Sequence, residues 1–95
     1  MSAYVIFTRV KTINAAEMKI YSDTVAPTLK GHEVKILAAY GPKDVLEGPE
    51  SEGIFMMEFP TMQAARAWYD SPAYREVREH RFRGAEYRVV IVQGV

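Results

Sequence analysis

The chain has 95 residues, with twelve basic and twelve acidic side chains and no cysteine. This length fits one domain over residues 1–95, and the absence of cysteine excludes disulfides and thiolate chemistry. Balanced charge provides no field to attract nucleic acid or an anionic membrane, so we expect neither as a partner. A cytoplasmic location fits the absence of cysteine. The first ten residues lack a basic leader and a long apolar run, which predicts neither a signal peptide nor a membrane span.

The first third of the chain predicts a strand followed by an interrupted helix. Residues 3–10 are rich in aromatic and β-branched types, which favour strands. Asn14 is a good helix N-cap, and Glu17 three residues later completes the pattern of a capping box. Apolar side chains then recur at helical spacing, at Met18, Tyr21, Val25 and Leu29. Pro27 lacks a backbone donor and predicts a kink, and Gly31 predicts the end of the helix.

The middle of the chain predicts two strands separated by a polar loop. Residues 34–40 form the first of these, and residues 44–47 are a possible extension of it. Gly41-Pro42 interrupts the segment, which favours an edge strand or a bulge because proline cannot donate to a sheet ladder. Residues 53–59 form the next strand.

The last third predicts a broken helix and a closing strand. Thr61 is a helix N-cap, and Ser71-Pro72 supplies a second cap and first-turn proline, so we expect a break at 70–72. Gly84 ends the helix, and residues 87–93 form the fourth strand. The order βαββαβ predicts an α+β, ferredoxin-like fold with both helices on one face of a four-stranded antiparallel sheet.

Both faces of this predicted sheet are apolar. Phe55, Met57 and Phe59 alternate with Ile54, Met56 and Glu58, and the other strands show similar alternation. Two helices can cover only one face, whereas an antiparallel strand exposed to water normally alternates apolar with polar residues. We therefore expect a second copy of the chain to cover the other face, as a homodimer through the sheet. A covering loop or a wrongly assigned strand is the alternative.

Four segments carry a resemblance to a known family. They are Glu58-Phe59-Pro60-Thr61, Ala65-Arg66-Ala67-Trp68-Tyr69, Ser71-Pro72-Ala73-Tyr74 and Arg88-Val89-Val90-Ile91-Val92. On these segments the chain resembles the DUF1330 family of small bacterial domains of unknown function, within the dimeric α/β-barrel superfamily. The resemblance implies that two sheets pair face to face as a dimeric α/β barrel. One departure is His32-Glu33, where the family typically shows a His-Gly-Gly turn.

Two residues are candidates for acid–base chemistry. Glu58 lies between two apolar residues on the face assigned to the dimer, where desolvation of a carboxylate favours a general base. The alternative is an ion pair with Arg9 or Arg88. His32 lies between the first helix and the second strand and could act as a base or orient a ligand, or it could be an ordinary surface histidine.

Aromatic residues complete the candidate ligand-binding set of Glu58, His32, Tyr21, Tyr69 and Tyr74. Trp68 is expected to pack in the core while Tyr69 lines a pocket or the dimer seam, and Tyr74 follows the helix break. The hydroxyls of Tyr4, Tyr21 and Tyr40 could also line a cleft, although tyrosine is common at ordinary interfaces. His80 lies among charged residues and is expected on a solvated helix face. No metal-binding spacing is present, so we predict no metal and no cofactor.

Two functions are compatible with these residues. The first is a homodimer that binds a small apolar or aromatic molecule in a cleft between helices and sheet, with polar groups from the tyrosines, Glu58 and His32. The second, from the superfamily resemblance, is a cofactor-independent enzyme, similar to a monooxygenase or isomerase, with Glu58 or His32 as general base. A purely structural dimer is a third possibility.

Overall fold

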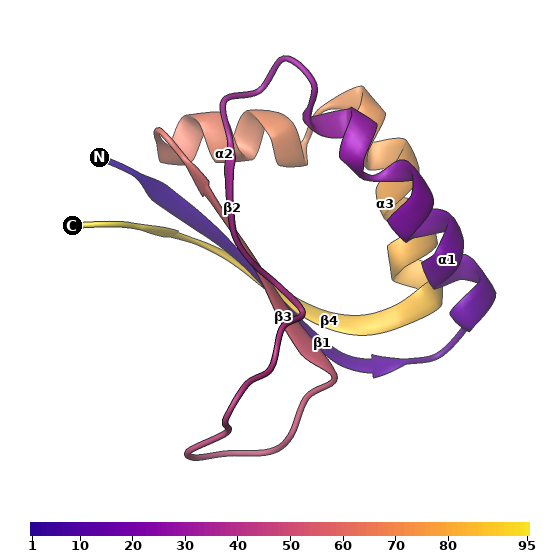
Figure 1. The fold of residues 1–95 in the computed structure, drawn as a ribbon. Coiled ribbons are helices and arrows are strands. Elements are labelled where there is room, and N and C mark those ends of the chain that lie inside the picture. Colours follow the sequence, from indigo (N-terminus) through magenta and orange to yellow (C-terminus); the bar gives the residue numbers. More distant parts are fainter.

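The computed structural model describes every residue from Met1 to Val95 as a sheet with helices packed on it (Figure 1). The elements are β1 (Ala3–Thr12), α1 (Ala15–Thr24), a 3₁₀ helix η1 (Ala26–Leu29), β2 (Lys35–Ala39), β3 (Gly53–Phe59), α2 (Met62–Tyr69), α3 (Pro72–Gly84) and β4 (Ala85–Gln93). The strands form one antiparallel sheet in the order β2-β3-β1-β4. The α+β, ferredoxin-like fold predicted from the sequence is confirmed.

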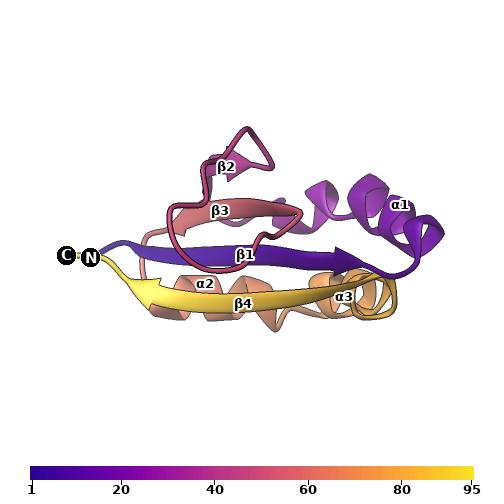
Figure 2. The ribbon, with the colours of Figure 1, turned by 90° about the horizontal axis from the view of Figure 1, so that it is seen from below.

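The helices all lie on one side of the sheet (Figures 1 and 2). Alternation along the strands turns Val5 and Phe7 of β1 and Met57 and Phe59 of β3 toward the helices, and these four side chains are buried. Trp68 of α2 is also fully buried, as predicted, and packs on this layer.

None of the helices is both long enough and apolar enough to cross a bilayer.

Local sequence signals determine where the helices begin and end. The side chains of Asn14, Thr61 and Ser71 accept hydrogen bonds from backbone N–H groups three residues later, at 3.2, 3.0 and 3.3 Å. The Ser71 cap separates α2 from α3, so the predicted break at 70–72 is confirmed. Pro27 lies in η1, where the first helix changes to 3₁₀ geometry, and Gly31 follows with a φ of +85°.

Strand β2 is shorter and less regular than predicted. It lies at the sheet edge, and its register with β3 shifts between Ile36 and Ala38, which marks a bulge. The bulge places Ile36 on the same sheet face as Ala39, although strict alternation predicted opposite faces. The extension expected over residues 44–47 is wrong, because that segment belongs to the loop between β2 and β3.

The face of the sheet away from the helices is apolar at its centre. Ile6 of β1 lies between Met56 of β3 and Val90 of β4 in the sheet register, and Val90 is 54% exposed. The loop between β2 and β3 projects on this side (Figure 1). Its residues and Thr8, Val10, Ile54 and Arg88 of the sheet line a common hollow. The loop therefore lies beside one end of the open face, and the row around Ile6 is outside this hollow.

A partly exposed charge cluster ties α1 to α3 and corrects two expectations. The backbone N–H of Glu17 donates to the Asn14 side chain. The Glu17 carboxylate, however, points toward α3 instead of completing a capping box. Its oxygens lie 2.6 Å from His80 Nδ1 and 3.2 Å from Arg83 Nε. His80 is therefore half-buried in a helix–helix contact rather than on a solvated face. The physical reason is that α1 and α3 pack side by side, which brings residues far apart in the sequence together.

Acid should weaken this α1–α3 contact. The hydrogen bond with His80, with help from Arg83, holds the pKa of the Glu17 carboxyl below its usual range. A carboxyl whose pKa is lower in the folded state than in the unfolded state stabilises the folded protein. This stabilisation is complete at a pH above the unfolded-state pKa of about 4.3, and it disappears as the pH falls through the folded-state pKa. In urea unfolding from about pH 6 to pH 3, Glu17→Gln should therefore show a smaller loss of stability than the wild type. Glu76→Gln, on α3, serves as the control; a wild-type pH slope in Glu17→Gln would contradict the prediction.

Candidate functional site

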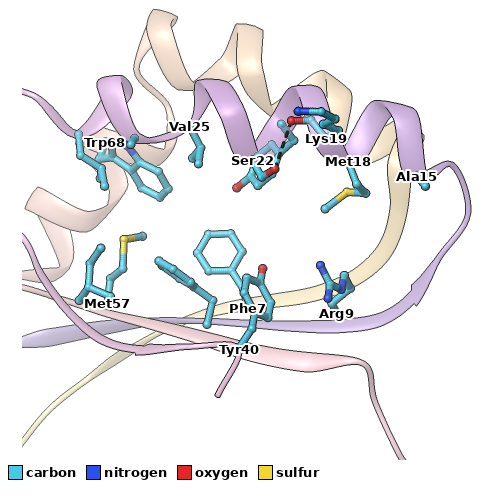
Figure 3. Close-up of a pocket in the computed structure, with 15 residues that line it drawn as sticks. Phe7, Arg9, Ala15, Met18, Lys19, Ser22, Val25, Tyr40, Met57 and Trp68 are labelled. Carbon is cyan, nitrogen blue, oxygen red and sulfur yellow. Dashed lines mark hydrogen bonds between the residues drawn. The ribbon is translucent and has the colours of Figure 1, made fainter. Parts of the chain in front are cut away.

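A cavity of about 460 Å³ lies between α1 and η1 on one side and strands β1, β2 and β3 on the other (Figure 3). Twelve of its fifteen lining residues are hydrophobic, and small-molecule sites commonly have a mostly apolar lining. Its apolar wall includes Phe7, Phe55, Met57, Val25, Leu29 and Trp68.

The two ends of the cavity differ in chemistry (Figure 3). Trp68 and Met57 lie at one end, while Arg9 rises from the sheet toward Met18 at the other. Arg9 faces the helices because it is two residues after Phe7 on the same strand. Met18, Tyr21 and Val25 reach the cavity from α1 because residues three and four apart share one side of a helix.

Trp68 forms a rigid wall. Its indole N–H donates to Thr28 Oγ1 at 3.1 Å, and the Thr28 hydroxyl donates to the Val25 carbonyl at 2.6 Å. The Trp68 ring packs on Phe59 with ring centroids 5.9 Å apart and meets Phe7 edge-on at 6.3 Å. With its polar atom paired inside the protein, the indole contributes an apolar surface to the cavity.

Tyr21 is the predicted site residue that lines this cavity. Its hydroxyl hydrogen-bonds to the hydroxyl of Tyr74 at 2.8 Å, and both side chains are buried. Burial raises the pKa of Tyr21 and of Tyr74, and the neighbouring Tyr74 raises that of Tyr21 further. Both phenols therefore stay protonated at neutral pH and act as hydrogen-bonding groups rather than as bases.

Arg81 of α3 lies beside this tyrosine pair. Its side chain is only 3% exposed and forms no ion pair with a carboxylate. One terminal nitrogen donates to the Tyr69 hydroxyl at 3.2 Å, and the guanidinium lies 5.0 Å from the Tyr87 ring centroid and 5.5 Å from that of Phe7. Tyrosine oxygens and aromatic ring faces thus surround the buried Arg81 guanidinium and interact with its charge.

Tyr40 closes the sheet side of the cavity in an unusual backbone conformation. It has a φ of +58°, the only positive φ of a residue other than glycine. Its hydroxyl hydrogen-bonds to that of Tyr87 at 2.7 Å, and its ring packs on Phe55 at 5.7 Å and under the Arg9 guanidinium at 4.6 Å. Burial, followed by the Tyr87 hydrogen bond, raises the pKa of Tyr40. Backbone strain held by several contacts is typical of functional sites.

Gly53 makes room for the Tyr40 ring. A β-carbon at Gly53 would lie 2.6 Å from Tyr40 Cδ1, and the ring cannot move without losing its three contacts. We expect Gly53→Ala to destabilise the protein by about 1–3 kcal/mol in urea unfolding, as other overpacked sites do. Gly41→Ala is the matched control, because a β-carbon there meets open space. Equal stability of the two variants would show that the Tyr40 ring is free to shift.

The structure does not bring the remaining candidates together in the cavity. Tyr74 lies behind Tyr21, and Tyr69 packs on Tyr74 with ring centroids 5.5 Å apart. Glu58 lies on the open face, opposite Tyr4 and Lys35 in the sheet register, and forms no ion pair. His32 lies in the loop before β2, with its backbone N–H donating to the Leu29 carbonyl at 3.0 Å. Glu58 and His32 thus lie outside the lining of this cavity.

Arg9 was not predicted as a site residue, and Tyr40 was considered only as a tyrosine whose hydroxyl could line a cleft. Arg9 was considered as an ion-pair partner for Glu58, but its Nε lies 3.1 Å from Glu52 Oε1 instead, because Glu58 is on the other sheet face. Arg9 follows Val5 and Phe7 at the same two-residue spacing, so it lies on the same face of β1. A cationic residue on this buried face is a signal in the sequence that could have identified Arg9 as a site residue. The role of Tyr40 depends on a left-handed backbone that no local pattern indicates. No group of three or more His, Cys, Asp or Glu side chains could hold a metal ion.

These features define a ferredoxin-like α+β domain with an apolar cavity between its helices and its sheet. The family model for DUF1330, a domain of unknown function, matches residues 2–95. The chain therefore belongs to the DUF1330 family, as its sequence motifs indicated. No curated protein matches the chain.

Solved structures share the fold at low sequence identity. A protein of unknown function from Rhodopseudomonas palustris has a TM-score of 0.77 and 18% identity over 99% of this chain and 82% of its own. A dimeric ferredoxin-like protein of unknown function from Jannaschia sp. CCS1 has a TM-score of 0.65 and 18% identity over 99% of this chain and 100% of its own. SnoaB, a cofactor-independent oxygenase from Streptomyces nogalater, has a TM-score of 0.61 and 8% identity over 99% of this chain and 93% of its own.

Proposed function

We propose that this chain is a homodimeric binding protein that holds a small apolar or aromatic molecule between α1, η1 and the sheet. The observation that carries this proposal is the aromatic-lined cavity of about 460 Å³ in a chain of only 95 residues. An apolar ligand in this space would gain dispersion contacts with the aromatic and aliphatic side chains that line it.

The size and lining of the cavity support a small organic ligand. Such sites usually measure roughly 300–1,000 Å³ and combine apolar walls with a few polar groups. Here the polar groups are Arg9, Lys19, Ser22 and the hydroxyls of Tyr21 and Tyr40. They form the minor, polar part of an otherwise apolar lining.

Binding fits the cavity better than general-base catalysis does. The likeness to the oxygenase SnoaB concerns the fold, at 8% identity. No carboxylate or imidazole lines the cavity, and its tyrosines have raised pKa values. An enzyme that used Glu58 or His32 as its base would have to place its substrate outside this cavity.

The dimer in this proposal pairs the open sheet faces. The row formed by Ala38, Met56, Ile6 and Val90 crosses all four strands on that face and leaves apolar surface in water. A second copy covers such a face with an identical apolar row, and two-fold pairing is the commonest arrangement of soluble oligomers. The description of the Jannaschia protein as dimeric supports this choice. The cytoplasmic location expected from the absence of cysteine stays a prediction.

A neutral fluorescent probe tests the cavity. Aminoanthracene brightens in apolar surroundings, and we expect it to bind wild-type protein saturably. Val25 lines the cavity, so Val25→Phe should fill part of the space and weaken binding by about tenfold or more. Ala67→Phe adds the same ring to an exposed position of α2 as a control. Equal binding by both variants would place the probe elsewhere, for example on the open sheet face, and contradict the proposal.

A further inference from the structure

The polar end of the cavity is built around one arginine with unused hydrogen-bond donors. A guanidinium carries five N–H groups in a planar fork. Arg9 Nε is buried and lies 3.1 Å from Glu52 Oε1, yet it is not aligned to donate a hydrogen bond. No other N–H group of Arg9 donates to an acceptor within the chain. The fork therefore lines the cavity with its donors available.

The position of this guanidinium is set before any ligand binds. Its carbon lies 4.6 Å from the centroid of the Tyr40 ring, which supports one face. The Tyr40 ring is held in turn by the Tyr87 hydrogen bond and by the space that Gly53 leaves. Glu52 is anchored by the backbone N–H of Thr12 at 2.8 Å and steadies the Nε side. A preorganised arginine loses less conformational entropy when it binds an anion.

The cavity lining contains two cationic side chains, Arg9 and Lys19, and no carboxylate. Arg9 Nε already lies 3.1 Å from Glu52 Oε1, so the guanidinium offers an anion its terminal N–H groups rather than an unpaired charge. The Lys19 ammonium pairs with Asp23 at 2.8 Å at an exposed position, so its charge lies on the solvent side. Arg9 is the cation that points into the space between sheet and α1 (Figure 3).

We propose that the ligand of this cavity is an amphipathic carboxylate. Its hydrocarbon or aromatic body would lie against Met57, Phe55 and Trp68, and its carboxylate would accept two parallel hydrogen bonds from Arg9. The two chemically different ends in Figure 3 match the two parts of such a molecule. Carboxylate is favoured because its two oxygens fit the arginine fork. This inference rests on the proposed binding function and specifies the ligand class.

Displacement of aminoanthracene by a matched pair of ligands tests the inference. Phenylbutyrate and phenylbutanol share the same body and differ in the carboxylate. We expect the wild type to bind phenylbutyrate at least about tenfold more tightly, as charge-assisted bidentate pairs are strong. Arg9→Met should abolish that preference while keeping phenylbutanol affinity within about threefold, and Arg9→Lys should keep part of it. Arg66→Met removes an exposed, ion-paired arginine of α2 and should behave as the wild type.

The outcomes separate the ligand class from the binding function. Equal affinity of the wild type for the two ligands, or an acid preference that survives in Arg9→Met, would overturn the carboxylate inference and leave the cavity as a neutral binding site. Failure of both ligands to displace the probe would contradict the binding function itself, and the carboxylate inference with it. Circular dichroism of each variant checks that the fold is retained.

Discussion

Replacement of Trp68 by alanine should destabilise the protein by about 3–5 kcal/mol, which is a large part of the stability of a small domain. The side chain is 0% exposed and packs on Phe7, Phe59 and Tyr74, with the Trp68 and Tyr74 ring centroids 4.0 Å apart. The substitution would also leave the Thr28 hydroxyl without its indole donor. Because Trp68 already borders a cavity, its removal enlarges a space that neighbouring side chains cannot fill.

Urea unfolding followed by circular dichroism measures this loss, since the only tryptophan is the one removed. Phe82→Ala is the control, because Phe82 is a large aromatic residue that is half exposed on α3. We expect it to cost about 1 kcal/mol or less, mainly through its contacts with Arg78 and Arg81. A cost for Trp68→Ala as small as that for Phe82→Ala would show that α2 is not anchored to the sheet through this ring.

If two chains pair through their open sheet faces as proposed, replacement of Val90 by glutamate should convert the dimer into a monomer at micromolar concentration. Val90 is 54% exposed in the single chain, so the substitution leaves the core of the protomer intact. In a symmetric pair the change occurs twice and places two unpaired carboxylates in an apolar interface, at a cost of several kcal/mol. We expect the dimerisation affinity to fall by about a hundredfold or more.

Sedimentation equilibrium measures the change in assembly. Ile20→Glu is the matched control, since Ile20 is an exposed apolar residue on α1, far from the open face of the sheet. That variant should remain a dimer. A Val90→Glu protein with the mass of the wild-type dimer would mean that the open sheet face is not the interface.

Local signals in the sequence were sufficient to predict most of the fold. Asn14, Thr61 and Ser71 satisfy the first N–H groups of their helices as predicted, and Pro27 ends the regular α-helix. Each of these effects acts within a few residues of the chain. The failures at the edge strand, the Ile36–Ala38 bulge and the missing extension, depend on pairing with β3. Those at Glu17 and His80 depend on the packing of α1 against α3.

The site was only partly predictable, for reasons of geometry. Helical spacing placed Tyr21 correctly on the inner side of α1. Strand alternation also placed Glu58 on the face opposite to Met57 and Phe59, and that alone removes it from a cavity under the helices. The group of Arg9, Tyr40 and Gly53 comes from three segments, and its arrangement depends on one left-handed residue. No local pattern contains that information.

The most direct test is a native mass spectrum of the protein with aminoanthracene. If each chain of a pair encloses its own apolar cavity, the spectrum should show a dimer that carries up to two probe molecules, and Val25→Phe should remain a dimer with little or no probe. A single-chain species would contradict the pairing. A wild type that takes up no probe, or equal loading of the wild type and Val25→Phe, would contradict the cavity as the place of binding.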